Sequence, residues 1–250
     1  MEGEKFKTKL SPEERKEWNE IIKSGVRAQE LIEGSIAVGG TAAALYAEHR
    51  ISRDTDHLLM SLKENFDEIL ERLSEAPEWK LARIRKPVLI LGSINDVEVG
   101  FRQSKRVKPI ETEVIKTDYG NLTVPTLDEL IGMKAYLAYS RNTTRDYLDF
   151  AALSECATEE EVLDSLLKLD ERYGETQTSS VGLEVAKALT AAEPFDLGET
   201  DLSNYKALAP EWHDWSKVEK ICRRFGVLLG EKLIYASPTS ENREMDSGGD

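Results

Sequence analysis

The feature that most constrains the fold of this chain is a change in hydrophobic periodicity at Pro125. Before it, short apolar runs such as Val88–Leu91 alternate with turn residues, which is typical of strands. After it, apolar residues recur at three- and four-residue spacing, and helices are expected near residues 126–140, 143–155, 158–173, 180–190 and 214–230. We therefore predict an α+β chain, with a mixed sheet and flanking helices followed by an all-helical part.

The first part begins with a strong helix signal. Ser11 supplies an N-cap hydroxyl and Pro12 occupies the first helical position. The patterns that follow predict helices ending near 24 and 33, strands at 36–38 and 54–59, a helix at 61–76, and strand pairs within 88–101 and 111–124. The predicted domains are 1–124 for the α/β part, 125–235 for the helical part and 236–250 for a polar, disordered tail.

Composition narrows the classes of function. A formal net charge of −14 disfavours broad, non-specific binding of nucleic acid, but it is compatible with one local basic site. No segment approaches the roughly 18 apolar residues of a membrane span, and the first residues lack the apolar segment of a signal peptide. The two cysteines and three histidines have no metal-ligand spacing, so we expect no structural zinc site. We predict a cytoplasmic, reduced, globular protein without a membrane partner.

Two neighbouring motifs predict a phosphate and metal site. Gly39 and Gly40 end a strand and allow a sharp turn, and the following helix N-terminus offers free N–H groups that suit a phosphate. Thr41 adds a hydroxyl donor. Asp54 and Asp56 alternate on a strand and so share one face, where Mg²⁺ would relieve their repulsion. Either motif alone is common at solvated turns and strand edges, but together and in this order they favour the site.

A third carboxylate could come from Asp96 or Glu98. Alternation alone explains both residues, with the neighbouring valines buried and the acids in water. A carboxylate beside the aspartate pair would instead complete a clamp for in-line phosphoryl transfer, and for that position we favour Glu98. The basic run at 105–108 is either a solvated loop or a contact for a nucleotide or RNA backbone.

Basic residues on the helix after Pro125 form the last signal. Lys134 and Arg141 fall on its apolar stripe, where a buried cation needs a counter-charge. One hypothesis aims Lys134 at a triphosphate, with Arg141, Arg145 and Asp146 close by. The alternative is that the cations reach solvent or pair with Asp146 or Asp149.

Together these segments resemble the AbiEii/AbiGii-type nucleotidyltransferase toxins, within the DNA polymerase β-like superfamily. The matching segments are 37–42, 49–56, 124–130 and 145–149, with Lys134 and Arg141. The resemblance implies a small mixed sheet with flanking helices and a helical C-terminal domain. It also implies an NTP substrate, an acceptor that in some members is the 3′ end of tRNA, and an antitoxin partner.

The resemblance also implies roles for the candidate residues. Asp54, Asp56 and Glu98 would hold Mg²⁺, Lys134 would bind the nucleotide phosphates, and Asp146 would act near the acceptor or as a supporting acid. From the residues themselves we add the hypothesis that the turn at Gly39–Thr41, Arg141 and Arg145 complete the nucleotide site and that the acceptor hydroxyl attacks the α-phosphorus. Two alternatives stay open: a nucleotidyltransferase acting on a small molecule such as an antibiotic, and a catalytically lapsed nucleotide-binding module.

Overall fold

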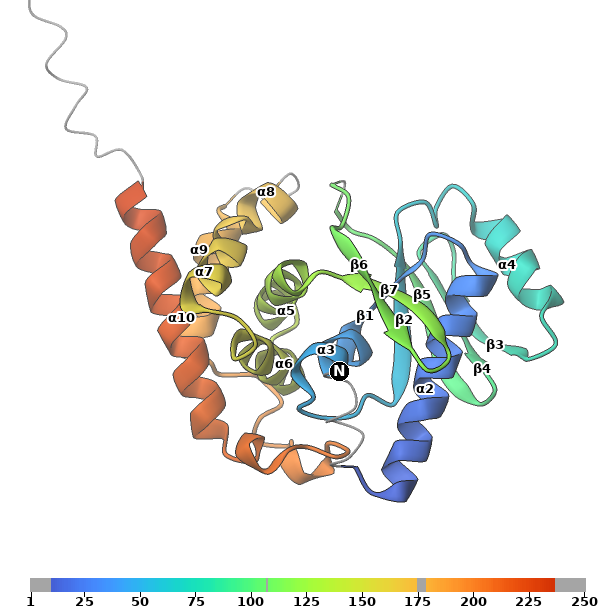
Figure 1. The fold of residues 1–250 in the computed structure, drawn as a ribbon. Helices are drawn as coiled ribbons and strands as arrows, with labels where there is room; N and C mark the ends of the chain where they lie inside the picture. Colours follow the sequence, from blue (N-terminus) through green and yellow to red (C-terminus); the bar gives the residue numbers. More distant parts are fainter. Residues whose placement is uncertain (1–9, 107, 175–178, 237–250) are drawn as a thin grey trace, which may run out of the picture.

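The computed structural model describes residues 10–106, 108–174 and 179–236, and Figure 1 shows a sheet with its helices beside a layer of helices. The α+β class is therefore confirmed. Nearly all of the predicted tail, residues 237–250, lies outside the described residues. The first part contains α2 (Pro12–Leu31), β1 (Ile36–Val38), α3 (Gly39–Ala47), β2 (Asp54–Leu59), α4 (Phe66–Glu75), β3 (Trp79–Arg85), β4 (Leu89–Ile94), β5 (Val97–Gln103), β6 (Thr112–Thr117) and β7 (Gly120–Pro125).

The second part is helical from its first element. It contains α5 (Leu127–Arg141), α6 (Thr144–Ser154), α7 (Glu159–Leu167), α8 (Leu169–Tyr173), α9 (Val181–Ala191), the short 3₁₀ helices η2 (Leu202–Asn204) and η3 (Pro210–Trp212), and α10 (Trp215–Ala236). Within the described residues, no helix is both long and apolar enough to cross a bilayer.

The main sheet has five strands in the order β1-β2-β5-β4-β3. β2 and β5 are parallel neighbours, whereas the other neighbouring pairs are antiparallel; β6 and β7 form a separate two-stranded sheet. The register places Asp54 opposite Glu98 and Asp56 opposite Gly100. Because paired residues point to the same side, these four positions share one face of the sheet.

The opposite face is the buried one. Thr55, His57 and Leu59 alternate with the aspartates on β2 and are buried. Helices α2 and α4 contribute to the hydrophobic cluster on this side, which comprises Ala28, Ile32, Leu59, Leu62, Phe66, Ile69, Leu73, Ala76, Trp79, Ile90, Ile94, Val99 and Phe101. The aspartate face is thus left free to border a cavity.

Helix α2 runs unbroken from Pro12 to Leu31, so the predicted division into two helices was wrong. Gly25 lies inside it, where an added Cβ would come within 3.3 Å of the Thr55 hydroxyl. The glycine lets the helix approach β2 closely, and this packing outweighs its low helix propensity. The predicted start is confirmed, because Ser11 and Glu14 form a capping box.

Three further elements differ from the sequence prediction. The helix expected at 61–76 begins only at Phe66, and the one expected at 158–173 divides at Lys168. Strand β3 was not predicted, because Trp79 is its only buried residue and alternation is therefore hidden. Edge strands of this kind carry little of the periodic signal on which sequence interpretation depends.

The larger hydrophobic cluster joins the two parts of the chain. It contains residues of α2, β1, α3 and β7 together with residues of α5, α6, α7, α9 and α10. The strand part and the helical part therefore share a core, and the region between them is where the candidate site residues meet.

Candidate active site

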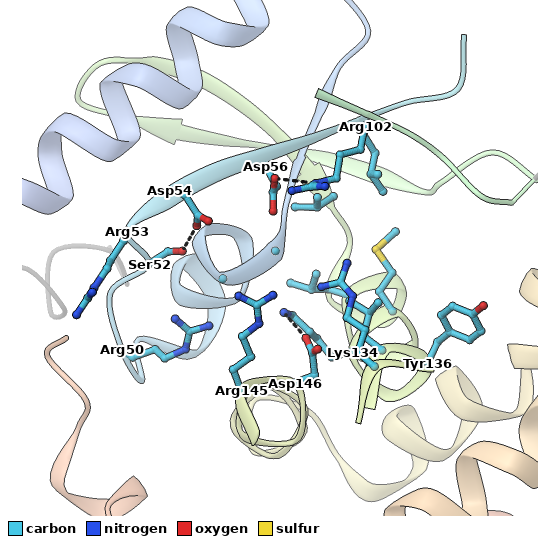
Figure 2. A pocket seen from close by; sticks show the side chains of 18 of the residues that line it. Arg50, Ser52, Arg53, Asp54, Asp56, Arg102, Lys134, Tyr136, Arg145 and Asp146 are labelled. Carbon is cyan, nitrogen blue, oxygen red and sulfur yellow. Dashed lines mark hydrogen bonds and ion pairs between the residues drawn. The ribbon is translucent and has the colours of Figure 1, made fainter. Parts of the chain in front are cut away.

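A cavity of about 620 Å³ lies between the aspartate face of β2 and helices α5 and α6 (Figure 2). Segment 199–206, between α9 and α10, closes part of its rim. Nine basic and five acidic side chains line it, in a chain whose net charge is −14. They are Arg50, Arg53, Arg102, Lys105, Arg106, Lys134, Arg141, Arg145 and Lys206, and Asp54, Asp56, Asp146, Glu199 and Asp201. Three of the basic groups pair with acidic residues outside the lining, so the positive charge available to a ligand is that of the cations without such a partner.

The turn between β1 and α3 forms one edge of the cavity. Gly39 has a φ of +73°, which an L side chain rarely adopts, and it begins α3. At Gly40 an added Cβ would lie 2.8 Å from both the Arg50 guanidinium and the Ser52 hydroxyl. Thr41 does not line the cavity: it is buried, and its hydroxyl donates to the Asp54 carbonyl at 2.6 Å. The prediction that Thr41 offers a donor to a phosphate was therefore wrong.

Asp54 and Asp56 project from β2 into the cavity, as Figure 2 shows. Asp54 Oδ1 accepts from the Ser52 hydroxyl at 2.8 Å, and Asp56 Oδ1 accepts from Arg102 Nε at 3.0 Å. Gly100 makes room for Asp56, because a Cβ there would lie 2.6 Å from Asp56 Oδ1. Each half-buried carboxylate keeps a second oxygen with no hydrogen bond to a described residue.

The structure does not assemble the predicted three-carboxylate set. Glu98 is opposite Asp54 in register, but it is exposed and does not line the cavity. Asp96 lies in the β4–β5 turn with a φ of 67°, and its carboxylate accepts from Lys80 at 2.7 Å. Among the described residues, no group of three acidic, histidine or cysteine side chains could hold a metal. The Asp54–Asp56 pair alone fits a hard cation, because its two open carboxylate oxygens face the same cavity.

On the opposite wall, a second set of charged side chains pair with one another. Lys134 on α5 lies 2.7 Å from Asp149 Oδ2 and 3.4 Å from Asp146 Oδ1. The other oxygen of Asp146 accepts from the Thr143 hydroxyl at 2.8 Å. All three charged groups are buried, although Lys134 and Asp146 border the cavity. Lys134 therefore follows the ion-pairing alternative while still reaching the cavity wall.

Asp149 is the centre of this second set, and sequence analysis gave it only a secondary place. Arg50 binds both of its oxygens, at 2.8 and 2.9 Å, and His49 Nε2 lies 2.8 Å from Oδ1. Burial alone would raise the pKa of Asp149, but the charges of Arg50 and Lys134 hold it well below its usual range. Burial lowers the pKa of His49, which keeps that ring neutral at pH 7.

Four cations that line the cavity have no ion pair with a described residue, and one of them, Arg53, donates to the Asn204 carbonyl. Arg141 ends α5, Arg145 lies in the first turn of α6, and Lys105 follows β5. Figure 2 shows Arg145 extending from α6 toward the aspartate pair. The rest of the basic run has other contacts: Arg106 is buried against Glu129, at 2.7 and 2.8 Å. Arg141 and Arg145 are thus the predicted residues best placed to meet an anion.

An aromatic pair at the far end of the cavity was not predicted. The rings of Tyr136 and Tyr173 stack with centroids 4.1 Å apart, and the Arg106 guanidinium lies over Tyr173. Burial raises the pKa of Tyr173 to about 12. The two tyrosines come from different helices 37 positions apart, so no local sequence signal links them. With Leu130 and Met133 they give the cavity one apolar end.

Comparisons with known proteins agree with this fold. A family model described as "Nucleotidyl transferase AbiEii toxin, Type IV TA system" matches residues 38–218, which is more than half of the chain. The crystal structure of JHP933 from Helicobacter pylori is similar, with a TM-score of 0.52 and 17% identity over 90% of this chain and 95% of that one. A second H. pylori chain, described as a nucleotidyltransferase, has a TM-score of 0.52 and 18% identity over 90% and 98%. At such identities the likeness concerns the fold alone.

A curated protein matches part of the sequence. The mycolic acid-containing lipids exporter MmpL11 of Mycolicibacterium smegmatis is 28% identical over 131 residues, which is 51% of this chain and 13% of that protein. The chain therefore spans only a small fraction of the curated relatives it matches. Nothing about the exporter's activity transfers to this chain from so short a segment.

Proposed function

The chain belongs to the AbiEii family of nucleotidyltransferase toxins of type IV toxin–antitoxin systems, and we propose that it transfers an NMP from an NTP to an RNA hydroxyl, with tRNA as the first candidate. In this reaction the acceptor oxygen attacks the α-phosphorus and pyrophosphate leaves. The family implies an antitoxin as well as the NTP substrate.

One observation carries the proposal: the open Asp54–Asp56 pair faces a cavity with a surplus of basic side chains. A triphosphate needs both features, because its charge must be balanced and its reacting phosphorus must be oriented. The cavity volume of about 620 Å³ lies within the ordinary range for small-molecule sites.

The phosphate-binding role is assigned to groups whose charge or N–H is available. The N-terminus of α3 at Gly39 and Gly40 offers backbone donors beside the aspartates. Arg141 and Arg145 supply unpaired guanidinium groups, which suit phosphate oxygens. Lys134 presents an ammonium already balanced by two carboxylates, so it would orient an oxygen without adding net charge.

Mg²⁺ is the cation that the residues fit best, held by Asp54 and Asp56. When bound, it would neutralise phosphate charge and polarise the reacting oxygens. The chain's own contribution is to hold the pair in place: Ser52 and Arg102 each fix one carboxylate oxygen, and Gly100 leaves space for Asp56. Asp146 acts as a positioning residue, because it touches Lys134 and Thr143.

The basic lining also bears on the small-molecule alternative. An acidic surface would attract cationic antibiotics, but more basic than acidic side chains line the cavity itself. An anionic acceptor such as RNA fits that lining better, and the aspartate pair argues against a lapsed site.

The test uses matched substitutions at two positions that are partners in the sheet. Purified wild type, Asp54→Asn and Glu98→Gln are each incubated with total tRNA, Mg²⁺ and one α-labelled NTP at a time. We expect label on tRNA with the wild type, a loss of at least about 100-fold in Asp54→Asn, and near-normal transfer in Glu98→Gln. Circular dichroism and thermal unfolding check that both variants fold.

Two results would contradict the proposal. Full activity in Asp54→Asn would remove the aspartate pair from catalysis. Tight NTP binding, measured in parallel, without label on tRNA from any of the NTPs would move the acceptor to another RNA, a small molecule or a protein. A large loss in Glu98→Gln would instead restore Glu98 as a third carboxylate that turns inward during the reaction.

A further inference from the structure

The sheet face that continues from the aspartate pair toward strand β3 is open and basic. We define the acceptor face as Arg83 and Arg85 on β3, Leu89 and Leu91 on β4, and Arg102 on β5. We propose that this face binds the phosphate backbone of the RNA acceptor and leads its reacting end to Asp54 and Asp56. The inference rests on the proposed function and adds to it where the acceptor docks.

Strand register places the acceptor face beside the aspartates. Asp56 is opposite Gly100, Gly100 is opposite Leu91, and Leu91 is opposite Arg83. Cross-strand partners point to the same side, so Arg83 shares the face of Asp56. Three strand spacings separate them, or about 14 Å across the sheet.

The neighbouring row repeats this arrangement. Leu58 is opposite Arg102, Arg102 is opposite Leu89, and Leu89 is opposite Arg85. Arg102 lines the cavity and donates to Asp56, so the row begins inside the candidate site. Two rows of the sheet therefore connect the cavity to an arginine on the edge strand.

A bulge in β3 sets the direction of these arginines. Leu81 is opposite Gly92 and Arg83 is opposite Leu91, so Ala82 is the extra residue. After the bulge, Ile84 lies on the α4 side of the sheet, and Arg83 and Arg85 lie on the aspartate side. With regular alternation from Leu81, both arginines would point to the α4 side instead.

Both arginines are available to a ligand. The side chains of Arg83 and Arg85 are exposed and have no hydrogen bond or ion pair with a described residue, whereas the side chains of their neighbours Lys80 and Lys86 each pair with an aspartate. Helices α2 and α4 pack against the opposite face. Leu89 and Leu91 are half-buried and lie in the sheet between the edge arginines and β5.

Charge and continuity favour RNA over other occupants. A strand of RNA laid along the two rows would place phosphates near Arg83 and Arg85 and its end near the aspartates. Charged side chains on an edge strand can also serve only to prevent strand pairing between molecules. A charge of either sign prevents strand pairing, whereas only a positive charge binds phosphate. Reversing the charge of the arginines therefore distinguishes the two roles.

The experiment compares two double charge reversals with the same change in net charge. Arg83→Glu/Arg85→Glu alters the acceptor face, and Lys116→Glu/Lys220→Glu alters exposed residues of β6 and α10 that do not line the cavity. Binding of total tRNA is measured over a series of salt concentrations, together with Mg·NTP binding and transfer of label to tRNA. A third variant, Arg83→Lys/Arg85→Lys, keeps the positive charge.

In the variant Arg83→Glu/Arg85→Glu, the Kd for tRNA should be about tenfold higher or more. The slope of log Kd against log salt concentration should become shallower by roughly the amount that one phosphate contact contributes, or more. NTP binding by this face variant should equal that of the wild type. The control should bind tRNA within about threefold of the wild type, and the lysine variant should restore most of the affinity.

Different outcomes separate the two claims. If the wild type labels tRNA and the face variant binds tRNA as tightly as the control, the acceptor face is wrong and the proposed function stands. If the wild type neither binds nor labels tRNA, the proposed function fails and the acceptor face fails with it. If the face variant binds tRNA as the wild type does but labels it poorly, the two arginines do not dock the acceptor and the inference is overturned.

Discussion

Each wall of the cavity is built on an element that carries two aspartates, and the surroundings of the two pairs are opposite. On β2, Asp54 and Asp56 are half-buried, and each has one hydrogen-bonded oxygen and one open oxygen. On α6, Asp146 and Asp149 are fully buried and contact two cations, a histidine and a threonine.

This difference separates two uses of the same side chain. A carboxylate that must bind and release a cation needs free oxygens and access to solvent. A carboxylate that compensates buried charges needs the opposite, because removing it leaves those charges unpaired. The β2 wall therefore suits chemistry, and the α6 wall suits the positioning of Lys134 and Arg50.

The sharpest test of this contrast is the loss of Asp149. Asp149→Ala leaves Arg50 and Lys134 buried without their shared partner, so the free energy of unfolding should fall by about 3–5 kcal/mol. Asp54→Asn should change it by less than about 1 kcal/mol, because that carboxylate is half-buried and loosely held. Urea unfolding followed by circular dichroism measures both, and equal losses would break the comparison.

A smaller effect should come from the space beside Asp56. In Gly100→Ala the new methyl group would meet Asp56 Oδ1 at 2.6 Å; because this oxygen ends a half-buried side chain that can shift, the cost in stability should stay below about 1 kcal/mol. The displaced carboxylate should also slow nucleotide transfer by about 100-fold, because reacting groups tolerate little misplacement. Gly230→Ala, on α10, makes only an ordinary contact at 3.9 Å and serves as the control for both readouts. Unchanged transfer in Gly100→Ala would mean that Asp56 need not be held in place.

The smallest effect concerns pH. Burial lowers the pKa of His49, behind the α6 wall, and lowers that of His57, behind β2, to about 3. Each folded-state pKa lies below the unfolded value, so the unfolded chain takes up protons first as the pH falls. Below about pH 6.5 the free energy of unfolding should therefore decrease by up to about 1.4 kcal/mol per pH unit for each histidine.

The variant His57→Leu checks this dependence. The slope of unfolding free energy against pH, between pH 6.5 and 5, should be reduced in the variant whatever its absolute stability. An unaltered slope would show that His57 takes up a proton in the folded protein, and that solvent reaches this side of β2 more readily than the burial of His57 indicates.

The β2 wall could be predicted because its parts are close in sequence. Gly39, Gly40, Asp54 and Asp56 lie within 18 positions, and their spacing alone sets a turn, a helix and a strand face. Thr41 was misassigned because its hydroxyl has two possible uses, a phosphate or a neighbouring carbonyl. Only the packing of α3 against β2 decides between them, and it favours the Asp54 carbonyl.

The α6 wall and the acceptor face were beyond sequence analysis for a different reason. Arg50 and Asp149 are 99 positions apart, and nothing local indicates that they meet. Glu98 has the alternation expected of a cavity residue, and the register does place it opposite Asp54. Its side chain is nevertheless exposed, which alternation alone could not predict. The bulge at Ala82 reverses the direction of two arginines, and a simple period of two predicts the wrong side.

The buried pairing of Arg50 with Asp149 also has a consequence for turnover. Arg50 lies in the loop that precedes β2, and Asp149 lies in α6. Their hydrogen bonds therefore connect the two walls of the cavity. If the walls separated in a hinge motion, the Arg50 guanidinium and the Asp149 carboxylate would lose each other as partners in every catalytic turnover. Nucleotide exchange should therefore proceed through a cleft of fixed width, with substrates selected by their dimensions rather than by closure around them.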